Sequence, residues 1–81
     1  MKKEDTMVLE RIAKYIAENY DKDEEDITVE TTFESLRMES EDVTDMYFQM
    51  SCEFDFIPDE DDLEGIEDVG QLAELIERLK D

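Results

Sequence analysis

The chain has 81 residues, of which 27 are Asp or Glu and 8 are Lys or Arg, so its formal net charge is −19. It contains no His, one Cys and 40% hydrophobic residues. This length fits a single domain over residues 1–81, and the lack of His removes the commonest general base and the usual zinc and copper ligands. The negative charge repels nucleic acid and anionic membranes. We therefore expect a non-catalytic protein without a metal site.

Cysteine content and hydropathy indicate a reducing, cytoplasmic setting. Cys52 has no second cysteine for an internal disulfide, and its apolar-periodic surroundings predict a buried small hydrophobe. No apolar stretch approaches the roughly 20 residues of a transmembrane helix, and the first residues lack the apolar core of a signal peptide. We expect a cytoplasmic monomer that does not insert into membranes.

A first helix is predicted from about Met7 to Tyr20. Either Asp5 or Thr6 is available as its N-cap, and apolar residues recur at helical spacing at Val8, Leu9, Ile12, Ala13, Ile16 and Ala17. The following residues 21–26 are too highly charged to pack against a core. Apolar anchors then come at Ile27, Val29 and Phe33, which predicts a long structured loop between the first two helices.

A second helix is predicted to begin at Ser40, with this residue as the N-cap. Acidic residues in the first turn favour the positive end of the helix dipole. The apolar stripe of this helix contains Val43, Met46, Tyr47, Met50 and Phe54. Pro58 keeps the residue before it out of the helical region, so the helix is expected to end near residues 53–55.

Two further helical segments are expected after Pro58. Asp59 is predicted to cap a short turn of helix that carries Leu63 and Ile66, with Gly65 and Gly70 as helix breakers. The last helix shows apolar periodicity over residues 69–79 and ends in basic residues. The expected fold is all-α, a small four-helix bundle with three longer helices, a short third helix and a long loop between helices one and two.

The distribution of charge predicts the kind of partner. No Lys or Arg occurs between Arg37 and Arg78, whereas acidic residues are dense in this window. A surface of one sign directs association towards basic patches on other proteins. The alternative is that the acidity only confers solubility. We expect Glu41, Asp42 and Asp45, on the second helix, to contact a basic partner surface.

At two places the sequence resembles the acyl carrier proteins and related carrier domains. Residues 32–40 (TFESLRMES) are similar to the family's Phe, two residues, Leu-Gly-x-Asp-Ser-Leu pattern, and residues 53–61 (EFDFIPDED) are similar to its Glu-Phe-Asp-x-x-Ile-Pro-Asp-Glu-Asp stretch, one residue shorter. The fourteen residues from Ser40 to Phe54 match the family spacing. The resemblance implies an acyl carrier protein fold over the whole chain.

The resemblance also implies a cofactor and partners. Ser40 would carry a covalent 4′-phosphopantetheine arm that holds an acyl-type intermediate as a thioester. The partners would be a phosphopantetheinyl transferase and acyl-loading or acyl-processing enzymes with basic docking patches. The implied role of Glu39 is to bind the metal at the transferase during attachment. The full set of expected partner contacts is Glu39, Glu41, Asp42, Asp45, Met46, Glu53 and Asp55.

The sequence departs from the family pattern around Ser40. Arg37 stands where the family has Gly, Glu39 replaces Asp, and Glu41 replaces an exposed Leu that contacts partner enzymes. A second serine, Ser35, follows Glu34 and precedes Leu36, which imitates the attachment motif. Modification of Ser35 would displace the family register by five residues, so Ser40 is the expected site.

Other functions remain open on the sequence alone. Ser40 is interpreted either as a simple helix cap or as an attachment site. Residues 21–32 imitate the start of an EF-hand loop but have Asp26 and Thr32 where Gly and Glu are needed, which disfavours a calcium site. An unmodified acidic binding module or inhibitor, docking on a basic protein surface, is the main alternative. No nucleophile is paired with a base, which disfavours an enzyme.

Overall fold

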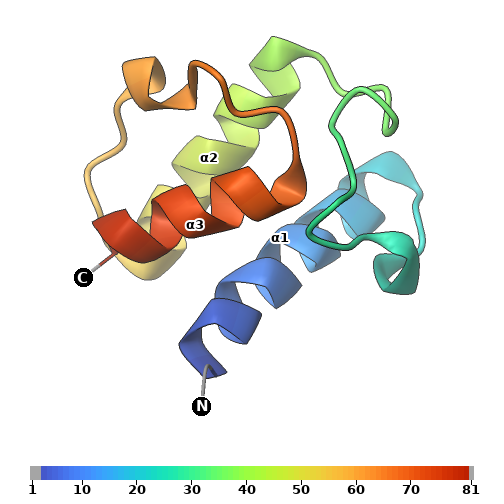
Figure 1. Ribbon diagram of the computed structural model, residues 1–81, viewed down its shortest axis with the longest axis horizontal. Coiled ribbons are helices and arrows are strands. Elements are labelled where there is room, and N and C mark those ends of the chain that lie inside the picture. The colour runs from blue at the N-terminus through green and yellow to red at the C-terminus, as the bar shows by residue number, and fades with distance from the viewer. Residues whose placement is uncertain (1–2, 81) are drawn as a thin grey trace.

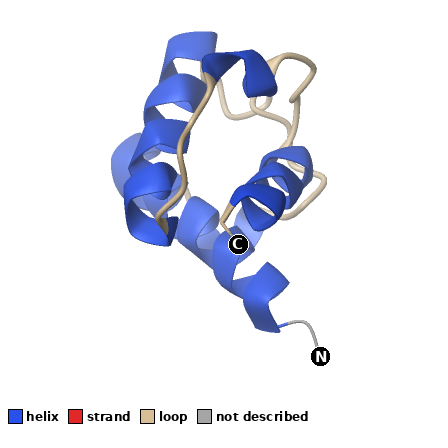
Figure 2. Cartoon of the chain, turned by 90° about the vertical axis from the view of Figure 1, so that its left-hand side faces the viewer, coloured by secondary structure: helices blue, strands red, loops and turns tan. Residues whose placement is uncertain are grey.

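The computed structural model describes residues 3–80, which form three α-helices (Figure 1). Helix α1 spans Lys3–Tyr20, α2 spans Ser40–Phe54 and α3 spans Val69–Leu79. Two short 3₁₀ segments, η1 at Glu24–Asp26 and η2 at Glu60–Leu63, lie in the connections. Figure 2 shows helices joined by loops, without a strand in the described chain. The all-α prediction is confirmed, but the expected short third helix is a single 3₁₀ turn.

Helix α1 begins earlier than its apolar periodicity predicts. Because the helix starts at Lys3, Asp5 and Thr6 lie inside it, and their prediction as N-caps is wrong. Its end at Tyr20 is confirmed, and Asp21 follows with a left-handed φ of 57°. The buried face of α1 consists of Val8, Ile12, Ala13 and Ile16.

The core lies between α1 and α3, and α2 packs against both of these helices. Helix α2 contributes Val43, Met46, Tyr47 and Met50, and α3 contributes Val69, Leu72, Ala73, Leu75 and Ile76. Both helices have the predicted bounds, because the apolar stripe of each helix faces this shared interior.

The connection between α1 and α2 is held to the core by its side chains and to α3 by its backbone. Ile27, Phe33, Leu36 and Met38 are buried, whereas Val29 is 49% exposed. Val29 was expected to be an apolar anchor, but only its backbone has this role: its carbonyl accepts a hydrogen bond from Gly70 N–H at 3.0 Å. The loop is therefore fixed to the start of α3.

Gly70 lies inside helix α3, so its prediction as a helix breaker is wrong. A Cβ at this position would stand 2.7 Å from the carbonyl oxygen of Val29. Glycine is needed here because the loop backbone approaches α3 closely, and not because the helix stops.

The connection between α2 and α3 has the predicted helix end and the predicted cap. Helix α2 ends at Phe54, within the expected range, and Asp55 takes a left-handed φ of 60°. The Asp59 side chain accepts a hydrogen bond from Asp61 N–H at 3.0 Å, which confirms it as the cap of η2. Leu63 belongs to this turn, but Ile66 follows it.

Cys52 lies on the exposed face of α2, so its predicted burial is wrong. Its neighbour Ser51 is buried instead, and the Ser51 hydroxyl donates a hydrogen bond to the Phe48 carbonyl. None of the described helices is both long and apolar enough to cross a membrane.

Candidate functional site

The loop before helix α2 holds Ser40 at the surface through three buried side chains. Phe33, Leu36 and Met38 are 5%, 8% and 7% exposed, respectively. The carbonyl of Phe33 accepts hydrogen bonds from the N–H groups of Leu36 at 3.1 Å and Met38 at 3.0 Å. This tight turn requires a left-handed residue, and Arg37 supplies it with a φ of 62°. Burial of this loop therefore sets the direction in which α2 begins.

Ser40 is the first residue of helix α2, and Glu39 is its N-cap. The Glu39 N–H donates a hydrogen bond to Asp42 Oδ2 at 2.9 Å, which satisfies the backbone just before the helix. The prediction of Ser40 as N-cap is therefore wrong by one residue. This displacement leaves the Ser40 side chain without a capping role.

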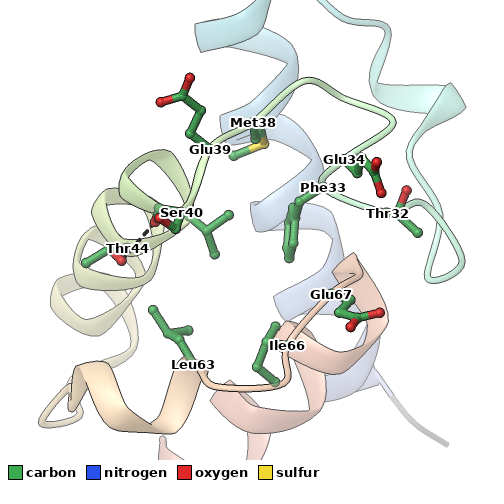
Figure 3. A pocket seen from close by; sticks show the side chains of 11 residues that line it. Thr32, Phe33, Glu34, Met38, Glu39, Ser40, Thr44, Leu63, Ile66 and Glu67 are labelled. Atoms are coloured by element: carbon green, nitrogen blue, oxygen red, sulfur yellow. Dashed lines mark hydrogen bonds between the residues drawn. The ribbon is translucent and has the colours of Figure 1, made fainter.

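The Ser40 hydroxyl is accessible. The residue is exposed, and among the described residues no hydrogen bond engages its Oγ atom. Its carbonyl accepts a hydrogen bond from Thr44 Oγ1 at 2.9 Å (Figure 3). The Ser40 side chain is therefore exposed and unengaged at the start of α2.

Ser35 is exposed too, but its hydroxyl is already engaged. Ser35 Oγ donates to the Thr32 carbonyl at 2.7 Å, and its N–H donates to Thr32 Oγ1 at 3.1 Å. Both bonds stabilise the loop turn in which Ser35 lies. Ser40 is therefore the more available of the two serines.

A pocket of about 450 Å³ adjoins Ser40, between the loop, helix α2 and the η2 connection. In Figure 3 the side chains of Phe33, Leu63 and Ile66 point into this space from different elements. Met38 and Val43 complete its apolar lining, and Thr32, Glu34, Glu39, Thr44 and Glu67 form polar parts of its wall. The pocket beside Ser40 therefore has both apolar and polar walls.

The structure gathers part of the predicted acidic surface beside Ser40. Glu39, Glu41 and Asp45 are exposed on or next to the first two turns of α2. Glu53 and Asp55 lie at the other end of this helix, about 20 Å away at 1.5 Å per residue. Glu53 is paired with Arg11 of α1, whose NH2 atom lies 2.6 Å from its Oε1. The predicted contacts therefore form two groups.

Met46 is fully buried in the core. This burial corrects its inclusion among the partner contacts, because its side chain cannot touch a docked protein without unpacking α2. Asp42 is only partly exposed. Burial raises the pKa of Tyr20, and the negative charge of Asp42 raises it further, so this carboxylate faces α1 as well as solvent.

Burial and the carboxylates of α2 also raise the pKa of a second tyrosine of α1. Burial is the largest cause that raises the pKa of Tyr15, and the charges of Asp45 and Asp42 add to it.

Among the described residues, no group of three or more Cys, Asp or Glu side chains is arranged to hold a metal ion. The carboxylates of α2 therefore form a charged surface.

Phe48 was not among the predicted site residues. It is 39% exposed on α2 and lines a shallow hollow that also contains Ser40. A signal was available in the sequence, because Phe48 lies outside the apolar stripe formed by Val43, Met46, Tyr47 and Met50. A large aromatic residue off the core-facing stripe is expected at the surface.

Comparison with known proteins adds an independent line of information. A family model described as the phosphopantetheine attachment site matches residues 10–76. The acyl carrier protein of Streptococcus thermophilus (strain CNRZ 1066) is 36% identical over 70 residues, which cover 86% of this chain and 92% of that protein. The matched region contains the loop, all of helix α2 and the wall of the pocket beside Ser40.

Proposed function

Because this chain belongs to the acyl carrier protein family, whose cofactor is covalently attached 4′-phosphopantetheine, we propose that Ser40 is the attachment residue and that the protein delivers acyl-type intermediates to partner enzymes. The observation that carries this proposal is the exposed, unengaged hydroxyl of Ser40 at the first position of helix α2. Members of this family act as carriers and not as catalysts.

The surroundings of Ser40 fit the group chemically. The first N–H groups of a helix lack intrahelical acceptors and favour an anion, so a phosphate on the Ser40 side chain would lie at a favourable end of α2. The adjoining pocket offers apolar side chains such as Val43 and Leu63 beside polar Thr44. When bound, the cofactor supplies a terminal thiol that carries the acyl group as a thioester.

The attachment step requires only a nucleophilic hydroxyl from this chain. Ser40 Oγ would form a bond to the phosphorus of the pantetheine phosphate in coenzyme A, the pyrophosphate bond would break, and adenosine 3′,5′-bisphosphate would leave. The hydroxyl proton would pass to a base of the transferase. We propose that Glu39 assists by binding the transferase's divalent cation, because its carboxylate is exposed next to Ser40.

Docking relies on the acidic face of helix α2. Glu39, Glu41 and Asp45 would attract basic patches on partner enzymes, and Asp42, Glu53 and Asp55 would extend the field. Electrostatic attraction of this kind accelerates association without a large apolar interface. A carrier that must visit several enzymes in turn benefits from such fast, reversible contacts.

The attachment is tested by intact mass after incubation with coenzyme A, Mg²⁺ and a broad-specificity phosphopantetheinyl transferase. We expect wild type and Ser35→Ala to gain one phosphopantetheine, and Ser40→Ala to gain none. Ser35→Ala is the matched control, because it removes the other exposed serine of the same loop region. A gain that persists in Ser40→Ala would contradict the proposal.

The exposed carboxylate of Glu41, directly after Ser40, favours a second candidate. In this alternative the chain is an unmodified acidic binding module or inhibitor that docks on a basic protein surface. It predicts no mass gain in wild type and a function that survives Ser40→Ala. Charge reversal at Asp42 and Asp45 would abolish partner binding under either function, so the mass measurement distinguishes them.

A further inference from the structure

A single cationic residue lies in the long acidic part of the chain around Ser40. Arg37 is the only Lys or Arg between Lys22 and Arg78, and every other charged residue in this interval is Asp or Glu. It precedes the proposed attachment residue by three positions. Because the phosphate of the cofactor would add a further negative charge at Ser40, the position of this one cation matters for the local electrostatic field.

The loop before α2 fixes the Arg37 backbone and leaves its side chain at the surface. Leu36 and Met38, on either side, are buried, whereas Arg37 is exposed. The Arg37 N–H donates a hydrogen bond to the Glu34 carbonyl at 3.0 Å. Its φ of 62° is left-handed, a conformation that Gly adopts at lower cost. Strained residues of this kind gather at binding sites, so we sought a ligand for the Arg37 side chain.

The Arg37 guanidinium is unpaired in the described part of the chain. Arg11 pairs there with Glu53 at 2.6 Å, and Lys80 pairs with Glu77 at 3.8 Å, but no ion pair or side-chain hydrogen bond engages Arg37. This holds although acidic residues lie two positions after it and three positions before it. The guanidinium can therefore bind a new anion without first breaking an ion pair.

Arg37 and Ser40 are close enough for the arginine to reach a group on the serine. Three residues of fully extended chain span at most about 10–11 Å between the two Cα atoms. The long arginine side chain and a phosphate on Ser40 Oγ can both extend into this distance. Arginine binds phosphate oxygens through paired N–H···O bonds, which are stronger than hydrogen bonds between neutral groups.

We propose that the Arg37 guanidinium binds the phosphate that joins 4′-phosphopantetheine to Ser40. The inference rests on the proposed attachment at Ser40 and deepens it, because it assigns the cofactor a second residue of this chain. Arg37 would offset the charge that modification adds beside Glu39 and Glu41, which are both exposed. It would also hold the base of the arm near the loop, while the rest of the arm remains free to move.

Nuclear magnetic resonance of the wild-type protein, before and after modification, tests the contact directly. We expect the Arg37 Nε–H signal to shift on modification and its exchange with water to slow several-fold, because a phosphate oxygen then accepts this hydrogen. The Arg78 Nε–H signal, from the last turn of α3, is the internal control and should stay constant. At about 0.5 M NaCl the Arg37 change should shrink, since salt screens an exposed ion pair. An Arg37 signal unchanged by modification would overturn the inference.

Thermal unfolding of modified and unmodified protein measures the contribution of the contact to stability. Arg37→Gln removes the charge but keeps a side chain at the left-handed position, so the backbone strain is retained. We expect the Tm of modified protein minus that of unmodified protein to be about 2–8 °C lower in Arg37→Gln than in wild type. Arg37→Lys, which keeps the charge, should recover part of this difference. Arg78→Gln is the matched control, because it removes another exposed arginine, and it should match wild type.

The outcomes separate this inference from the proposed function. Equal Tm differences in wild type and Arg37→Gln would overturn the contact while leaving attachment at Ser40 intact. An equal loss in Arg78→Gln would also overturn it, because net charge alone would then explain the effect. If Arg37→Gln is not modified, the wild-type Arg37 signal decides. Absence of phosphopantetheine on wild type would overturn both the proposed function and this inference.

Discussion

The two connections that flank the pocket beside Ser40 are held in different ways. The first, residues 21–39, contributes four buried apolar side chains and two backbone hydrogen bonds to the start of α3. The second, residues 55–68, has no fully buried residue, and packs through half-buried Phe56, Leu63 and Ile66. The Tyr47 hydroxyl adds contacts of 3.4 Å to Asp59 N–H and Asp62 Oδ2.

The two sides of the pocket therefore differ in how easily they can move. The first connection presents Ser40 in a constant position, because displacing it would expose Phe33 and Met38. The second connection supplies Leu63 and Ile66 to the pocket wall and can move at lower cost. The proposed attachment residue is therefore fixed in position, whereas the opposite wall of the pocket is compliant.

Removal of Phe33 should have the largest effect. Phe33→Ala deletes a ring that is 5% exposed, and we expect a loss of about 3–5 kcal/mol in the free energy of unfolding. Urea denaturation followed by circular dichroism measures this loss. Ile66→Ala, in the compliant wall, is the comparison variant and should cost less. Equal losses would remove the distinction between the two connections.

A side chain at Gly70 should weaken the attachment of the first connection to α3. Gly70→Ala places a methyl group 2.7 Å from the Val29 carbonyl oxygen, so we expect destabilisation of about 1–3 kcal/mol. Hydrogen exchange at the Gly70 amide position should accelerate as this contact breaks. Unchanged stability would show that the loop backbone moves away from α3 at no cost, which would contradict a firmly held first connection.

Loss of the Tyr47 hydroxyl should affect only the second connection. Tyr47→Phe keeps the buried ring and removes two long hydrogen bonds, so we expect a loss of about 0.5–1 kcal/mol. Amide exchange should accelerate at Asp59 and stay constant at Met38. Faster exchange at both amides would mean that the two connections move as one unit.

Relief of strain at Arg37 should stabilise the first connection. Its φ of 62° is left-handed, a conformation that costs a side chain about 1–2 kcal/mol, part of which Gly returns through unfolded-chain entropy. We expect Arg37→Gly to gain about 0.5–1 kcal/mol in thermal or urea unfolding. A loss of stability would indicate that the Arg37 side chain makes a compensating interaction.

Alkaline pH should weaken the fold through its tyrosines. Burial raises the pKa of Tyr47, and Asp62 raises it further against the opposing effect of Asp59 N–H. Because folded Tyr47 holds its proton more tightly than the unfolded chain, its contribution to stability is complete below the ordinary pKa of about 10 and is lost as pH rises through the folded value. Unfolding free energies between about pH 9 and 11 should fall in wild type, and less steeply in Tyr47→Phe.

Apolar periodicity predicted the helices because each buries one continuous stripe. The bounds of α3 follow from its stripe, whereas the first residue of α2 was predicted from the polar and acidic residues at the helix start. The errors arose where a partner from elsewhere in the chain decides the outcome. Gly70 is glycine because of Val29, and the identity of that neighbour is not encoded near residue 70. Cys52 was misjudged because its hydrophobic character was given more weight than its angular position on α2.

The candidate site was predictable in its location and less so in its details. Ser40 stands at the start of α2 as expected, but Glu39 caps the helix through the side chain of Asp42. Met46 was expected among the partner contacts but is buried, whereas Phe48, for which no role was predicted, is exposed, because their angular positions on the helix differ. Side-chain type alone does not distinguish these two positions.

Peptide mass spectrometry of the modified protein locates the attached group on the chain. Trypsin cleaves after Lys22, Arg37 and Arg78, and no Lys or Arg lies between Arg37 and Arg78. Ser35 and Ser40 therefore fall in separate peptides, 23–37 and 38–78. We expect one phosphopantetheine on peptide 38–78, with fragment ions locating it on Ser40. A phosphopantetheine on peptide 23–37, or on Ser51 or Thr44, would contradict this expectation.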